Sequence, residues 1–200
     1  MKYLKNILKC LAFIPLLIFL SCNPLVNESQ SNSLLIVSNL LGTDLEGNDV
    51  NYLQSDVVKV DEDTGQEYVT ADSATVTFEA KLMNPDPTTQ TSQYNDIIVD
   101  RYIVSYSRTH GNNTPGVDVP YPFEGSLNTL VEIGTSESVS FIVVREVAKL
   151  ETPLLDLKDG RGNGVLQVTA TIDFYGHDLS NNTVKATGYL NIFFANYIDE

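Results

Sequence analysis

The 200-residue chain has no tryptophan, only two cysteines and two histidines, and far fewer basic than acidic residues. Lys and Arg number 12 against 26 for Asp and Glu, so the formal net charge is −14. Nucleic-acid binding depends on basic side chains placed against phosphate groups. The charge therefore argues against a nucleic-acid partner, while it suits solubility and divalent cations.

The first 20 residues hold the longest apolar run of the chain. Lys2, Lys5 and Lys9 precede an apolar stretch that runs from residue 10 to residue 20 and is interrupted by Pro15. A basic start, a short apolar stretch and a small residue after it are typical of a secretory signal. The run is also shorter than the about 20 residues that a membrane-spanning helix needs. We therefore predict a signal peptide over residues 1–21.

The signal ends in Phe19-Leu20-Ser21-Cys22, which resembles the lipobox of bacterial lipoproteins, where a small residue directly precedes the cysteine. The resemblance implies cleavage after Ser21, a diacylglycerol thioether on Cys22 and attachment to the cell envelope through the lipid. Asn23 is not the aspartate that favours inner-membrane retention in enteric lipoproteins, so the outer membrane is the expected location. An ordinary cleaved signal with an incidental cysteine is the alternative.

Processing would leave Cys22 as the only thiol, because Cys10 lies inside the signal. No internal disulfide could then form, although exported proteins often use them. The loss of three lysines would leave 9 basic against 26 acidic residues, a net charge of −17. We expect residues 22–33 to form a polar tether and residues 34–200 to form one domain.

Strand patterns dominate the predicted domain, and no segment has a convincing helical period. Apolar and polar residues alternate with the period of two that is expected for strands with one buried face. The strands are predicted at 75–82, 97–106, 138–147, 166–174 and 184–194, with weaker ones at 34–41, 56–60 and 127–133.

The turn-rich segment 176–182 predicts a C-terminal hairpin over 165–195. Gly188, inside its last strand, predicts a bulge or a close approach by a neighbour. Many strands without intervening helices indicate an all-β, antiparallel β-sandwich. The C-terminal alternation resembles the immunoglobulin-like modules of bacterial surface proteins in architecture, although the antibody-type Trp and disulfide are missing.

The acidic segment 61–67 is the sharpest candidate for a metal site. Asp61, Asp63 and Glu67 surround Gly65, and calcium prefers six to eight oxygen ligands around a sharp turn. The glycine comes one residue earlier than in an EF-hand loop, and Ala71 stands where the closing glutamate is needed. An acidic, solvated hairpin loop is the alternative, and calcium is the one cofactor that the sequence suggests.

Two further groups of residues have weaker signals. His177 with Asp173 and Asp178 could form a metal site, but the histidine spacing is a poor signal for one. Tyr121 and Phe123 lie in a proline-rich loop, where rigid aromatic side chains suit contact with a partner. The alternative is that these rings hold the loop against the domain.

Motifs for catalysis are missing from the chain. It has no Gly-x-Ser-x-Gly elbow and no phosphate-binding loop, and the glycine-rich segment 160–164 precedes a strand pattern rather than a helix. We therefore expect a non-enzymatic envelope lipoprotein that serves binding, adhesion or assembly and has a protein or glycan partner. The alternative is a carbohydrate-active or carbohydrate-binding surface lipoprotein with a calcium-supported β fold.

Overall fold

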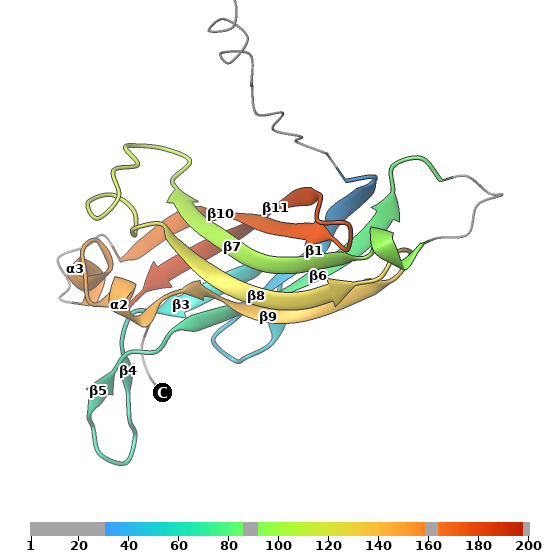
Figure 1. Ribbon diagram of the computed structural model, residues 1–200. Coiled ribbons are helices and arrows are strands. Elements are labelled where there is room, and N and C mark those ends of the chain that lie inside the picture. Colours follow the sequence, from blue (N-terminus) through green and yellow to red (C-terminus); the bar gives the residue numbers. More distant parts are fainter. Residues whose placement is uncertain (1–30, 86–91, 159–163, 198–200) are drawn as a thin grey trace, which may run out of the picture.

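The computed structural model describes residues 31–85, 92–158 and 164–197, and most of these residues lie in strands (Figure 1). Cys22, the signal peptide and most of the glycine-rich segment lie outside the described residues. In chain order the elements are β1 (Ser33–Thr43), β2 (Asp49–Val50), β3 (Tyr52–Asp56), β4 (Lys59–Val60), β5 (Glu67–Tyr68), β6 (Asp72–Leu82), the 3₁₀ helix η2 (Gln93–Asn95), β7 (Ile97–Ser107), β8 (Phe123–Val131), β9 (Ser136–Val144), α2 (Glu146–Lys149), α3 (Leu154–Lys158), β10 (Val165–Asp178) and β11 (Thr183–Ala195). No helix within the described ranges is long and apolar enough to cross a membrane.

The strands form two large sheets and a small hairpin. One sheet has the order β2-β1-β6-β9, the other has the order β3-β11-β10-β7-β8, and β4 pairs with β5. Strand pairing within the large sheets is antiparallel, except that β3 runs parallel to β11. The prediction of an all-β fold is confirmed.

The two large sheets face each other across an aromatic core. Phe78 on β6 meets Phe174 on β10 edge to face, with 4.9 Å between the ring centroids. Phe141 on β9 approaches Tyr102 on β7 at 5.0 Å and Phe174 at 5.3 Å. Because these contacts join strands of different sheets, the inward side chains of both sheets form one continuous core. The period of two in the sequence is the cause, since it gives each strand one apolar face.

The C-terminal hairpin predicted over 165–195 is confirmed to both ends. β10 and β11 pair without interruption from Val165 opposite Ala195 to His177 opposite Thr183. Pairing continues through Gly188, so the predicted bulge is wrong. The predicted close approach is confirmed, because a Cβ atom at Gly188 would lie 3.1 Å from Leu40 Cδ2.

A leucine at Gly188 is therefore expected to destabilise the fold. Its side chain would enter the space between the sheets that Leu40 and Val37 occupy, and overpacking of this kind costs about 1–3 kcal/mol. Urea unfolding of Gly188→Leu measures the loss. Thr183→Leu, at an exposed position on the same strand, is the control, and equal stability of the two variants would contradict the close packing of Leu40 and Val37 against Gly188.

Two predicted strands are corrected by the structure. The strand predicted at 138–147 ends at Val144, and the chain then forms α2, whose Val147 is 49% exposed. The strand predicted at 56–60 is divided between β3 and β4. Val57 and Val58 resemble strand residues because they are apolar, but they are buried in the connection between the two strands, where the Val57 N–H donates to the Ala195 carbonyl.

The folded part begins before residue 34. Ser31 is buried, and its hydroxyl donates to Asp178 Oδ2 at 2.6 Å, while Ser33 is the first residue of β1. Short polar residues give no periodic signal, so both serines were predicted to belong to the tether.

The contact between Ser31 and Asp178 marks one end of the molecule, which we call the N-terminal end. The opposite end, which we call the distal end, carries α2, α3, the β4–β5 hairpin and the loop after β7 (Figure 1). β10 connects the two ends with 14 residues, roughly 45 Å of extended chain.

Candidate functional site

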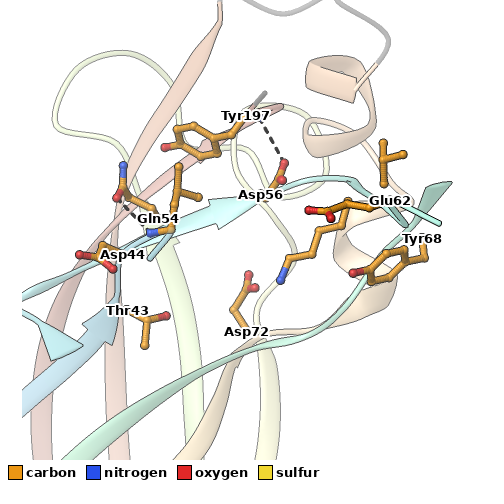
Figure 2. Close-up of a pocket in the computed structure, with 11 residues that line it drawn as sticks. Thr43, Asp44, Gln54, Asp56, Glu62, Tyr68, Asp72 and Tyr197 are labelled. Carbon is orange, nitrogen blue, oxygen red and sulfur yellow. Dashed lines mark hydrogen bonds between the residues drawn. The ribbon is translucent and has the colours of Figure 1, made fainter. Parts of the chain in front are cut away.

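A pocket of about 380 Å³ opens at the distal end of the molecule (Figure 2). The segments that line it are the turn after β1, the strand β3, the β4–β5 hairpin, the start of β6 and the C-terminal segment. The lining residues are Thr43, Asp44, Leu45, Gln54, Asp56, Lys59, Val60, Glu62, Tyr68, Asp72 and Tyr197. We call this cavity the distal pocket.

The distal pocket is acidic, because four carboxylates and one ammonium group line it. Figure 2 shows Asp56, Glu62 and Asp72 approaching the pocket from three different sides. The side chain of Asn48 and its main-chain N–H donate to Asp44, and these bonds hold the pKa of the Asp44 carboxyl below its usual value. The pocket therefore favours cationic or neutral polar groups over anions.

A buried ion pair lies behind the wall of the distal pocket. Lys149, from α2, is completely buried, and its Nζ lies 3.0 Å from each carboxylate oxygen of Asp72. The same ammonium donates to the main-chain oxygen of Asp56 at 2.7 Å, and the hydroxyl of Ser55 donates to Asp72 Oδ2 at 2.6 Å. These bonds connect α2, β3 and β6, and thereby hold two lining residues in place.

Nothing in the sequence singles out Lys149. A lysine is normally exposed, and the acidic partner lies 77 residues away in the chain. Only the packing of α2 against the ends of two strands makes the ion pair possible.

Tyr197 closes the pocket on the side of the C-terminal segment. Its main-chain N–H donates to Asp56 Oδ1 at 3.2 Å, and its hydroxyl donates to the Phe193 carbonyl at 3.3 Å. Burial raises the pKa of its phenol above the ordinary value, and the charge of Asp56 acts in the same direction. The group therefore stays protonated at neutral pH, and its proton is donated to the Phe193 carbonyl.

The predicted calcium residues lie on the β4–β5 hairpin and do not come together. Asp61 Oδ1 accepts the main-chain N–H of Thr64 at 2.8 Å and its hydroxyl at 2.7 Å, which lowers the pKa of Asp61. Glu67 pairs instead with Lys158 Nζ at 2.7 Å. Over the described ranges, no group of three or more His, Cys, Asp or Glu side chains could hold a metal ion. Calcium binding through Asp61, Asp63 and Glu67 stays a prediction.

His177, Asp173 and Asp178 also have separate partners. His177 and Asp178 are consecutive on β10, so their side chains lie on opposite faces of the sheet. The Nδ1 atom of His177 lies 3.3 Å from Asp100 Oδ2, and Asp173 accepts from Thr187 at 2.6 Å and pairs with Lys185 at 2.9 Å. The three residues do not form a shared site.

Asp178 is a buried carboxylate that organises the N-terminal end. It accepts hydrogen bonds from the Ser31 hydroxyl, from the main-chain N–H groups of Ser180 and Asn182, and from the Asn182 side chain. Burial raises the pKa of Asp178, but these bonds lower it by more, so the pKa lies below the ordinary value. The carboxylate therefore stabilises the folded state above the unfolded pKa of about 3.9, and this stability is lost as the pH falls through the folded pKa.

Asp178→Asn is expected to lower the free energy of unfolding by about 1–3 kcal/mol at pH 7, because buried donors lose their acceptor. Urea unfolding of both proteins at pH 7 and near pH 3 measures the effect. The difference should shrink at the acid pH, where protonation weakens the wild-type carboxylate. A difference that is the same at both pH values would contradict the role of the charge.

The two aromatic residues of the proline-rich loop have different surroundings. Phe123 is the first residue of β8 and packs against Tyr102 at 6.2 Å, with the Arg145 guanidinium 4.8 Å from its centroid. Tyr121 is half exposed, and its ring lies against Gly116. Phe123 therefore fixes the end of the loop, while contact of a partner with Tyr121 stays a prediction.

No protein-family model, curated protein or solved structure matches the chain.

Proposed function

We propose that the protein is a lipid-anchored envelope lipoprotein whose β domain binds a partner away from the membrane. The observation that carries the proposal is the sequence Leu20-Ser21-Cys22 at the end of a signal-like segment. Cys22 would be the only thiol after processing, and acylation gives it a use that no disulfide could. Two or more acyl chains would anchor the protein stably.

We further propose that the domain is an immunoglobulin-like sandwich. In such folds the sheets contain strands A-B-E and G-F-C. The orders β1-β6-β9 and β11-β10-β7 correspond to these strands, with β8 added at the edge. The parallel pairing of the short β3 with the last strand, after β1 has paired in the other sheet, also supports this topology.

The position of the anchor determines which end of the domain would face a partner. The first described residue, Ser31, lies at the N-terminal end, and the nine residues from 22 to 30 could span roughly 30 Å if they were extended. A net charge near −17 after processing would repel the anionic lipid surface. The distal pocket and the loops beside it would then point away from the membrane, where a partner can reach them.

Metabolic labelling with an alkyne fatty acid tests the anchor in a bacterial host. Wild-type protein should carry the label, and Cys22→Ala should lose it. Cys10→Ala is the matched control, because it removes the other cysteine and should keep the label. Label that persists in Cys22→Ala, or that is absent from the wild type, would overturn the proposal.

A further inference from the structure

Four aromatic side chains occupy the outward face of the five-stranded sheet. On β11 the even-numbered residues from 184 to 194 are buried, so the odd-numbered ones point outward. Tyr189 and Phe193 are therefore outward residues of β11, and the same alternation places Tyr175 of β10 and Tyr52 of β3 on this face. We call these four residues the aromatic face.

The strand register arranges the aromatic face as one elongated row. Tyr175 lies opposite Lys185, which is four residues before Tyr189 on β11, and Phe193 lies four residues after it. At the rise of an extended strand, the row is roughly 27 Å long. Tyr52 lies beside Asn191, between the last two rings, and meets Phe193 edge to face at 5.8 Å. Several sugar residues of an extended chain fit along this length.

Tyr189, at the middle of the row, is 66% exposed. Its ring has no aromatic or cationic partner among the described residues, and its hydroxyl has no hydrogen-bond partner there. Tyrosine is favoured in strands in general, so its presence there has a structural explanation. What indicates a ligand is that the Tyr189 ring is exposed and lies in one row with three other rings. Rigid aromatic rings of this kind give a ligand contact area at low cost in conformational entropy.

Uncharged hydrogen-bonding groups lie between the rings. Thr171 is opposite Tyr189, and Thr169 is opposite Asn191, to which its hydroxyl donates at 3.0 Å.

Beyond Tyr175 the face is hollowed by a cavity of about 230 Å³. The cavity is lined by polar and small residues, namely Asp100, Arg101, Gly176, His177, Asn181, Thr183 and Val184, together with Tyr175 itself.

Charges on this face nearly balance, with two cations against three carboxylates, of which Asp100 lies beside His177. Lys185 pairs with Asp173 at 2.9 Å, and Arg101 pairs with Glu124 at 3.7 Å. Both cations also lie over the ring of Tyr175, at 5.3 Å and 4.2 Å from its centroid. The face is therefore close to neutral in a chain of net charge −14. That balance disfavours nucleic acid and anionic lipid, which need a basic surface, while the charge of the rest of the chain repels a second copy.

We infer that the aromatic face binds an uncharged polysaccharide chain. One face of a sugar ring presents C–H groups that stack on an aromatic ring, and its rim presents hydroxyls that need hydrogen-bond partners. Tyr189, Tyr52 and Phe193 offer ring surface, and Thr171, Thr169 and Asn191 beside them offer hydrogen-bonding groups, without the net charge that would favour an ionic ligand. The ring of Tyr175, at the end of the row, is covered by the two cations and contributes mainly through them. The inference rests on the binding function proposed above and names its ligand class.

Affinity electrophoresis of the detergent-extracted, full-length protein tests the inference. Each native gel contains one probe, a β-glucan, an α-glucan, a mannan or a xylan, with polygalacturonate as the acidic probe. At least one neutral polysaccharide should retard the protein. Tyr189→Ala should weaken that retardation by about tenfold, whereas Tyr189→Phe, which keeps the ring, should retain it.

Tyr94→Ala is the matched control, because Tyr94 is 69% exposed but lies on η2, outside the aromatic face. It should leave the affinity unchanged. Retardation by no probe or by polygalacturonate alone, or equal effects of Tyr94→Ala and Tyr189→Ala, would overturn the inference. Acyl labelling is measured independently, so a labelled protein that binds no polysaccharide would contradict the aromatic-face inference and leave the lipid anchor intact.

Discussion

Lys149→Met is expected to lower the free energy of unfolding by about 3–5 kcal/mol, because it leaves a carboxylate without its buried partner. Lys149 is completely buried, and its ammonium is bound by the carboxylate of Asp72 and the main-chain oxygen of Asp56. Methionine fills a similar volume but donates no hydrogen bond. Urea unfolding at neutral pH measures the change.

Two further variants distinguish the loss of the buried ion pair from a general effect of removing a lysine. Lys59 lines the distal pocket but is only partly buried, so Lys59→Met should change stability by no more than about 0.5 kcal/mol. In Lys149→Met/Asp72→Asn no lone charge remains, so the loss should be smaller than the sum of the single losses. Strict additivity would contradict a direct pairing of the two charges.

Phe174→Ala is expected to cost about 3–5 kcal/mol, because the cavity it leaves lies at the centre of the core. Phe174 is fully buried and contacts Phe78 and Phe141 of the opposite sheet as well as Tyr102 of its own sheet. These four rings are held by strands of both sheets, so they cannot easily close over the missing side chain.

Phe174→Leu is the graded control, since leucine keeps most of the apolar volume. Its loss of stability should be clearly smaller than that of the alanine variant. Chemical denaturation with a constant slope in all three proteins makes the comparison valid. An alanine variant that loses less than about 1.5 kcal/mol would contradict the central place of Phe174.

The sequence predicted the features of the fold that depend on local alternation. The hairpin of β10 and β11 follows from a period of two on both sides of a turn-rich segment, and the structure confirms it. The glycine at position 188 indicated either a bulge or a close approach by a neighbour, and only the uninterrupted pairing and the packing of Leu40 show that it is a close approach. Most of the short β3 was missed because its burial comes from pairing with β11, and the paired residues Leu53 and Ile192 are 139 residues apart in the chain.

The candidate sites could not be predicted from the sequence, because each combines residues from segments that are far apart in the chain. The distal pocket takes its lining from five parts of the chain, and only the register of β3 on β11 brings Asp56 beside Tyr197. The outward position of Tyr189 could be predicted from the alternation of β11. Its alignment with Tyr175 and Tyr52 could not, because that depends on pairing between three strands.

Mass spectrometry of the N-terminal peptide, from protein isolated from membranes, is the direct test of the lipid anchor at Cys22. We expect a chain that begins at Cys22 and carries a diacylglycerol on its sulfur. A mature chain with an unmodified Cys22, or one that still begins at Met1, would contradict it.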